Sequence, residues 1–350
     1  MKQTILTFSI IIILFKTGNV LSNNNIFNVN NIEIAAKNSQ NKEKLINQAV
    51  LKGFNQLISR LLLDEDYKKI SKTNLIEIKK LVSYYQIVSP KDDIKNIKNK
   101  NINVNIFFDK ERIHNFFYSR NILYSDIINT EVILFPLLKK DNQYFIYTQN
   151  YFYDNWNEKN FDKLIQYTLP VENIENIQKI NLNKDNIYKL DVDNFFKEYD
   201  INNVVFANIE LTEKTGEIFL KTRIEGKSIN KKISIKKKEN LSSKQFYNEI
   251  IFEINNIIKD LIKSQNLIDV RTPSFINAKI DLDNESNLIE FNNRLKKIGL
   301  IDNFYVQQLN KDYVLIKIKY LGKIKKIMKK LKDENIDLKM INGQWKISLI

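Results

Sequence analysis

The fold is decided most clearly near the C-terminus, where residues 276–320 read INAKIDLDNESNLIEFNNRLKKIGLIDNFYVQQLNKDYVLIKIKY. Apolar and polar residues alternate over 276–282, which predicts a strand with one buried face. Apolar residues at helical spacing follow and end at Gly299, which predicts a helix. Two apolar runs at 304–309 and 313–320 are joined by a short polar turn and predict a hairpin.

The same alternation of elements continues to the last residues. Four apolar residues predict a second helix, and they are Ile324, Ile327, Met328 and Leu331. Residues 336–340 predict the last core strand, and the dipeptide Asn342-Gly343 predicts a turn into a short edge strand, Trp345–Leu349. The order β-α-β-β-α-β is the split βαβ, ferredoxin-like arrangement. We therefore predict a ferredoxin-like domain over residues 274–350.

The rest of the chain also mixes helices with strands, which predicts the α+β class. A strong helical pattern covers residues 40–62, with Gly53 on its apolar face, where a glycine allows close packing. A second long helix is predicted over 243–262, after three strands. We expect two small α/β domains before the ferredoxin-like domain, one over residues 23–140 and one over 141–266.

The first residues have the pattern of a secretion signal. Lys2 precedes an apolar run from Ile5 to Phe15, and small residues follow up to Ser22. The run is about half of the ~20 apolar residues that a membrane-spanning helix needs. We therefore expect residues 1–22 to be a signal peptide that sends the chain to the periplasm of a Gram-negative envelope. The chain has no cysteine, so we expect neither a lipoprotein anchor nor a disulfide, and no transmembrane helix in the mature chain.

The chain is basic, with a formal net charge of +14. Such a charge is typical of proteins that bind nucleic acid or anionic membranes. Lysine, asparagine and isoleucine are abundant together, however, and an AT-rich genome accounts for that composition. Arginine is scarce beside lysine and no RNA-binding signature is present, so we expect no nucleic-acid partner.

Residues that carry catalysis are sparse. His114 is the single histidine, so a histidine-based triad or a zinc site has little to draw on. Two S-x-x-K matches, at Ser39 and Ser228, lack the companion motifs of that class. Asp281-x-Asp283-x-Glu285 departs from a calcium loop at its sixth and twelfth positions, and no phosphate-binding glycine loop is present. We predict no enzyme activity, no cofactor and no metal.

Two clusters are candidate binding surfaces. The densest aromatic segment runs from Tyr144 to Trp156, and its candidate ligand-binding residues are Tyr147, Tyr151, Tyr153 and Trp156. Aromatic faces bind ligands, but alternating aromatics also pack in ordinary cores. Lysines crowd the polar side of the second C-terminal helix, and the candidates for contact with an anionic membrane surface are Lys325, Lys326, Lys329 and Lys330. The alternative is a solvated helix face.

The N-terminal half resembles a family of secreted proteobacterial proteins catalogued as domain of unknown function 2066. The resemblance covers about residues 27–225 and is carried by five segments, FNVNNIEI at 27–34, AVLKGFNQLISRL at 49–61, LVSYYQI at 81–87, VNIFFD at 104–109 and VILFP at 132–136. The family has no established activity, so the resemblance implies export and a small α/β fold but assigns no functional residue.

These observations predict an exported, non-enzymatic accessory protein that binds protein partners in the periplasm. Exposed sheet edges, including Trp345–Leu349, are expected to accept a strand from the partner. The first alternative is an envelope hydrolase or a carbohydrate-binding protein that uses the aromatic region with Asp154 or Glu158. The second is a peripheral binder of anionic membrane surfaces through the C-terminal lysines. The partner's identity and the oligomeric state are left open.

Overall fold

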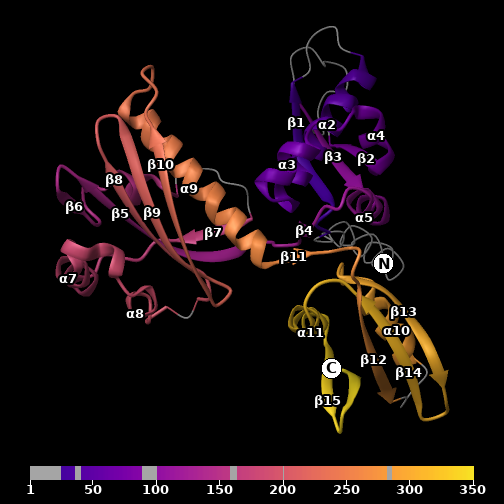
Figure 1. The fold of residues 1–350 in the computed structure, drawn as a ribbon. Helices are drawn as coiled ribbons and strands as arrows, with labels where there is room; N and C mark the ends of the chain where they lie inside the picture. Colours follow the sequence, from indigo (N-terminus) through magenta and orange to yellow (C-terminus); the bar gives the residue numbers. More distant parts are fainter. Residues whose placement is uncertain (1–24, 36–40, 89–100, 158–163, 200, 282–285) are drawn as a thin grey trace, which may run out of the picture. The chain divides into compact units, whose positions relative to one another are not determined.

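The computed structural model describes residues 25–35, 41–88, 101–157, 164–199, 201–281 and 286–350 (Figure 1). These residues form an α+β protein, as predicted, with antiparallel and mixed sheets. The chain divides into two units, which are described separately. Unit 1 comprises residues 1–57, 72–123 and 268–350, and unit 2 comprises residues 58–71 and 124–267. The predicted signal peptide, residues 1–22, lies outside the described residues.

Unit 2 is built on a six-stranded mixed sheet. The strand order is β10-β9-β8-β5-β6, with β7 also paired to β5. The strands are β5 (Thr130–Lys140), β6 (Gln143–Phe145), β7 (Ile165–Thr168), β8 (Val204–Leu211), β9 (Thr215–Ile224) and β10 (Lys227–Lys236). The helices are α3 (Asp64–Ile70), α6 (Tyr151–Asn155), α7 (Ile174–Asn183), η2 (Lys184–Lys189), α8 (Val192–Phe195) and α9 (Ser243–Gln265). Two short strands, β4 (Tyr124–Ser125) and β11 (Leu267–Ile268), pair with each other.

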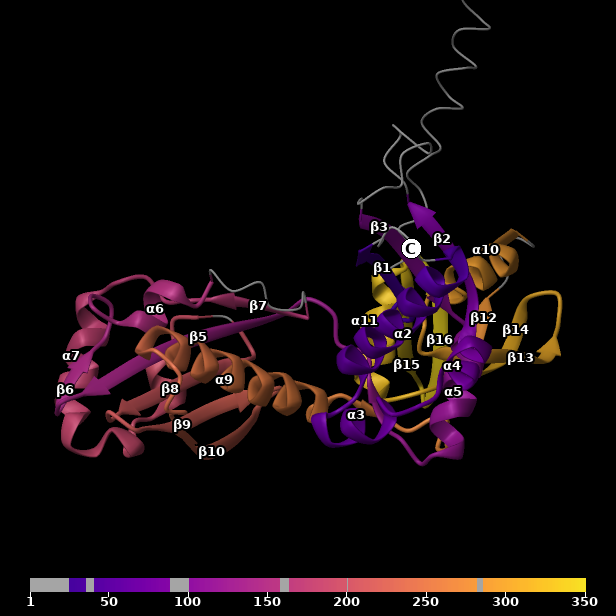
Figure 2. The same cartoon turned by 90° about the horizontal axis from the view of Figure 1, so that it is seen from above.

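Both faces of this sheet are buried, which explains why β5 and β8 read as continuous apolar runs. Alternate residues point to opposite sides, so Leu134 and Val205 join the core under α9, whereas Phe135 and Phe206 join the core under α7 and α8. Figure 2 shows α9 lying along one face. The predicted domain boundary after residue 140 would separate β5 from β8, its parallel neighbour. The structure instead begins this part of unit 2 at Tyr124.

Within unit 2, two charged residues of α9 contact residues 59–64, where one helix ends and α3 begins. The buried Lys263 ammonium donates hydrogen bonds of 2.6 Å to the carbonyl oxygens of Ser59 and Leu62, at the C-terminal end of a helix. One turn earlier, the Asp260 carboxylate accepts a 3.2 Å bond from the backbone N–H of Asp64, which opens α3. A cation therefore sits at a helix C-terminus and an anion at a helix N-terminus, as the helix dipoles favour.

The N-terminal part of unit 1 is a three-stranded antiparallel sheet in the order β1-β3-β2. Its elements are β1 (Asn28–Ala35), α2 (Lys42–Leu61), α4 (Leu75–Leu81), β2 (Val82–Val88), β3 (Asn101–Phe108) and α5 (Lys110–Ser119). Gly53 of α2 lies so close to β1 and β3 that a methyl group there would come within 2.8 Å of Ile32 Cδ1 and 3.2 Å of Ile106 Cγ1. The predicted close approach at Gly53 is therefore present.

The C-terminal part of unit 1 has the predicted order of elements. They are β12 (Ser274–Asp281), α10 (Ser286–Leu295), β13 (Ile301–Leu309), β14 (Tyr313–Tyr320), α11 (Ile324–Asp333), β15 (Ile336–Ile341) and β16 (Gln344–Leu349). The strand order is β13-β14-β12-β16-β15.

The prediction that Trp345–Leu349 forms an edge strand is wrong. β16 pairs in parallel with β12 on one side and antiparallel with β15 on the other, so β15 is the edge (Figure 2). The turn pattern at Asn342-Gly343 predicts that β15 and β16 pair with each other. It does not predict which of the two strands pairs with β12, because Ile347 and Leu338 both carry buried apolar side chains.

Asparagine supplies half of the twelve left-handed backbone positions in the described segments, and glycine supplies three of them. Nine non-glycine residues in the described segments have positive φ, and the six asparagines among them are Asn31, Asn121, Asn129, Asn142, Asn335 and Asn342. The chain has only seven glycines. Asparagine is tolerated in this region because its short side chain bonds locally, so it takes the role that glycine has in most turns.

Candidate functional site: an uncovered sheet edge and a lysine helix

Strand β2 is an edge strand whose second side has no partner strand among the described residues. It pairs antiparallel with β3 alone. Its side chains are exposed on both faces of the sheet, because Tyr84 is 57% exposed and its neighbour Tyr85, which points the opposite way, is 45% exposed. The strand reads VSYYQIV and carries no charge, proline or glycine. Such an edge is a template for pairing with another strand.

Local interactions hold β2 in this position. Asn74 caps α4 by accepting a 2.9 Å bond from the N–H of Glu77, and β2 follows α4 directly. The pairing shifts register between Val82 and Tyr84, and beyond that bulge the strand runs regularly to Val88. The Tyr84 ring stacks on Phe107 of β3 with centroids 4.2 Å apart. The exposed segment Tyr84–Val88 is therefore a regular, supported strand.

The other long edge strands carry charges that discourage pairing. In the described part of the chain, every other edge strand of more than four residues has at least one charged side chain. The charged residues on these strands are Glu33 in β1, Asp302 in β13, Asp337 and Lys339 in β15, and four lysines in β10. Lysine on an edge strand is a common device against unwanted strand pairing. Strand β2 lacks such a device.

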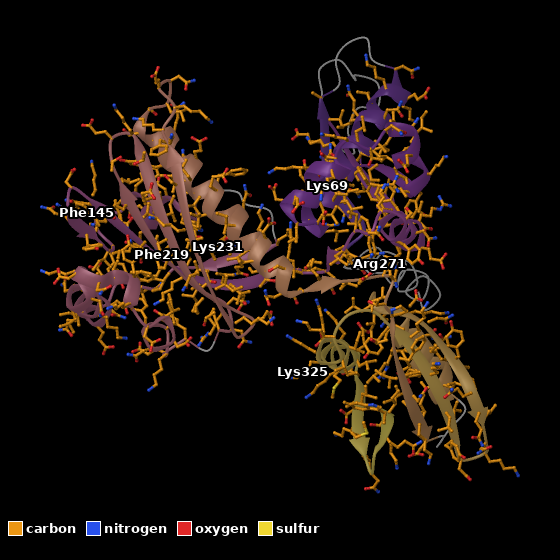
Figure 3. All side chains as sticks on the ribbon, viewed as in Figure 1. Lys69, Phe145, Phe219, Lys231, Arg271 and Lys325 are labelled. Carbon is orange, nitrogen blue, oxygen red and sulfur yellow. The ribbon has the colours of Figure 1, made fainter. Side chains whose placement is uncertain are left out.

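Helix α11 carries the second candidate surface (Figure 3, Lys325). Ile327 and Leu331 are buried, and the lysines occupy the remaining faces of the helix. Lys325, Lys329 and Lys332 follow the spacing i, i+4, i+7, so they form one exposed stripe. No carboxylate lies within 4 Å of these three ammonium groups in the described residues, whereas Lys330 lies 3.9 Å from Asp333.

The first turn of α11 lacks the capping and acidic residues that usually stabilise a helix N-terminus. Lys323 occupies the N-cap position without a side-chain cap, and the first turn contains lysines but no acid. A positive charge at a helix N-terminus opposes the helix dipole and costs roughly 0.3–1 kcal/mol. Departures of this kind from local rules concentrate at functional sites. Of the four lysines predicted from sequence, Lys325 and Lys329 have no carboxylate partner among the described residues, and the same holds for Lys332.

The structure separates the four aromatic residues predicted as one binding surface. Tyr147 and Trp156 are buried in the cores on opposite faces of the unit 2 sheet. Tyr147 accepts a 3.0 Å hydrogen bond from Asn176, and the half-buried Tyr153 donates a 2.9 Å bond to the Pro170 carbonyl. Tyr151 is also half-buried and donates to Asn248. These contacts are those of core packing, and Glu158 lies outside the described residues.

The single histidine is a core residue. His114 is buried in α5 and meets Phe27 edge to face, with centroids 5.5 Å apart. Burial, helped by the Lys110 ammonium, lowers the pKa of His114 to about 4. The described residues contain no group of three or more histidine, cysteine, aspartate or glutamate side chains that could hold a metal. The acidic run at 283–285 lies outside them.

The sequence patterns described above do not single out β2 as a site. The signal was available, because a seven-residue segment rich in aromatic and β-branched residues without charge is the signature of strand pairing. What the sequence did not report is that β2 lies at an edge. That depends on β3 pairing with both β1 and β2.

No protein-family model and no curated protein matches the chain. Its resemblance to domain of unknown function 2066 therefore stays a prediction. Among solved structures, the crystal structure of lipoprotein GNA1162 from Neisseria meningitidis matches 37% of this chain and 96% of that one, at 12% identity and a TM-score of 0.23. At that score nothing about function follows. Among the described residues, no helix has the length and apolar character needed to cross a bilayer.

Proposed function

We propose that this chain is an exported, non-enzymatic accessory protein of the bacterial envelope that binds protein through its exposed β2 edge. The observation that carries the proposal is the uncharged edge strand with Tyr84 and Tyr85 exposed on its two faces. In strand addition, backbone hydrogen bonds supply affinity and alternate side chains supply specificity. Tyrosine suits such a surface, since its ring adds contact area at a low entropic cost. The pattern of residues 1–22 supports export.

Site-specific photo-crosslinking in cells of the source organism tests this function. A photoreactive residue at Gln86, in the centre of the exposed segment, is expected to capture a defined protein. The same residue at Asn230 on the lysine-rich edge β10 serves as the control and is expected to capture none. Equal capture at both positions, or none at Gln86, would refute the role of β2.

A charged substitution provides the matched loss of function. Tyr85→Lys places an edge-blocking charge on β2 at a position already exposed, so the fold is expected to survive. Tyr118→Lys makes the same change on α5, where the side chain is also exposed. Capture at Gln86 should disappear in the first variant and persist in the second. Persistence in both would show that β2 does not pair with its target.

A second candidate function is binding to an anionic membrane surface through α11. It is favoured by the lysine stripe, which has no carboxylate partner in the part of the chain that the structure describes, since each lysine near such a surface is worth about 1 kcal/mol. Reversing two of these charges should weaken binding to phosphatidylglycerol-containing vesicles at least about thirtyfold, because the loss of two lysines alone is worth ~2 kcal/mol.

The double variant for this test is Lys325→Glu with Lys329→Glu. Its control is Lys227→Glu with Lys231→Glu on β10, which changes the net charge by the same amount. Vesicles of phosphatidylcholine alone should bind neither protein. Equal weakening by both double variants would mean that net charge, not α11, drives binding, and no weakening by the α11 variant would exclude this surface.

A further inference from the structure

We propose, on the basis of the function proposed above, that the strand that pairs with β2 is β2 of a second copy of this chain. The two strands run antiparallel with Gln86 on the two-fold axis. The three-stranded sheet β1-β3-β2 then continues into its copy through the paired β2 strands. An interface of this kind uses the same surface on both subunits, as two-fold symmetric dimers require.

The charge pattern of β2 suits pairing with its own copy, which a charged edge strand does not. In antiparallel self-pairing each strand meets its own sequence reversed, so any charged residue is brought close to its own copy or to a neighbour of the same strand. In β10, for example, Lys231 and Lys232 would face like charges, which destabilises a pair of strands. Strand β2 has no charged residue, so self-pairing meets no repulsion anywhere along it.

The register follows from the bulge in β2. The shift between Val82 and Tyr84 removes the first residues from the regular ladder and leaves Tyr84–Val88 to pair. The centre of that segment is Gln86. Centring the pair there puts Tyr84 opposite the partner's Val88 and Tyr85 opposite the partner's Ile87. Aromatic residues facing β-branched residues are stabilising cross-strand pairs.

Symmetric pairing also protects β2 from aggregation. A seven-residue uncharged strand without proline or glycine, left open at an edge, has the signature of segments that stack into fibrils. Natural proteins block such edges with charges, bulges or covering elements, and the bulge in β2 lies before Tyr84, outside the segment Tyr84–Val88. Pairing β2 with β2 of a second copy consumes both open edges at once. The assembly therefore closes at two subunits instead of growing.

Single-cysteine crosslinking of the full chain tests the pairing, since the sequence has no cysteine of its own. Directly opposed residues in antiparallel strands have Cα atoms about 4.5–5.5 Å apart, within the range that a disulfide spans. Gln86→Cys is expected to give a covalent dimer under mild oxidation. Ser228→Cys, exposed on β10, is the control and should stay monomeric. A mixture of Tyr84→Cys and Val88→Cys should crosslink more than either variant alone.

Sedimentation gives a readout that does not depend on disulfide geometry. The wild-type chain should be a dimer, and Tyr85→Lys should raise its dissociation constant about tenfold to thirtyfold, because the change is repeated on both sides of the axis. Val88→Lys provides a second variant with the same expectation. A monomeric wild type whose Gln86 captures a different protein in cells would overturn the self-pairing and leave the proposed function standing. A monomer that captures nothing would overturn both.

Discussion

Replacing Gly53 by alanine sets two opposing effects of known size against each other. Alanine in the middle of α2 gains about 1 kcal/mol of helix propensity over glycine. Its methyl group, however, would lie 2.8 Å from Ile32 Cδ1 and 3.2 Å from Ile106 Cγ1. Both isoleucines are fully buried, so their side chains have no free space to move into. Overpacking of this kind costs about 1–3 kcal/mol.

Taking about 2 kcal/mol for the overpacking, Gly53→Ala should destabilise the three-stranded sheet and its helix by about 1 kcal/mol. Gly53→Val adds two more methyl groups against the same wall, so it should cost about 3 kcal/mol or more. Gly299 offers the control, because a methyl group there meets no atom within 4 Å. Gly299→Ala should be neutral or slightly stabilising.

Hydrogen–deuterium exchange is the suitable assay, since a chain of two units need not unfold in one step. Amide protons of α2 that exchange through opening of this sheet should exchange about fivefold faster in Gly53→Ala, the equivalent of ~1 kcal/mol. Those of unit 2 β-strands should be unchanged. Slower exchange of α2 in Gly53→Ala would refute the reasoning, because it would show that Ile32 yields at no cost and that helix propensity alone decides.

Three further predictions concern single side chains. Lys263→Met should lower the stability of unit 2 by about 2 kcal/mol, because the carbonyls of Ser59 and Leu62 lose a charged donor, and urea unfolding should show no such loss for the exposed control Lys244→Met. Burial lowers the pKa of His114 to about 4, so the unfolded chain binds a proton that the folded chain does not as the pH falls below about 6.5. Stability should therefore drop by up to about 3 kcal/mol between pH 6.5 and 4 relative to His114→Phe, and parallel pH profiles of the two proteins would contradict this. Asn335→Gly should raise the free energy of unfolding by roughly 0.5 kcal/mol, because glycine adopts the left-handed conformation of this position more easily than asparagine. The unfolding temperature should therefore rise slightly, and a lower unfolding temperature would contradict this.

Local patterns in the sequence predict the elements of this fold better than their neighbours in space. The element order of the C-terminal domain and the close approach at Gly53 follow from periodicities within one helix or strand. The position of β16 does not, since two strands with similar apolar faces compete for the same place beside β12. Likewise, β5 lies at the end of the first predicted domain, directly before the second. Only its pairing with β8 shows that it belongs to the sheet of unit 2.

The candidate site shows the same division. The lysine stripe of α11 is visible in the sequence, because residues at helical spacing share a face whatever the helix packs against. The aromatic segment is ambiguous, since Trp156 and an exposed tryptophan would have the same local sequence. Recognising β2 as an edge strand required the sheet order, because Tyr84 and Tyr85 are exposed where β2 has no second partner strand among the described residues.

The asparagines at left-handed positions bear on how this protein tolerates mutation. Surface turns are ordinarily the places where substitutions do least harm. Here, a change of Asn121 or Asn335 to lysine needs only one base, and it would force a long side chain into a backbone conformation that costs about 1–2 kcal/mol. The turns of this chain should therefore be less robust to random mutation than its solvated helix faces, and sequence drift among its relatives should avoid them.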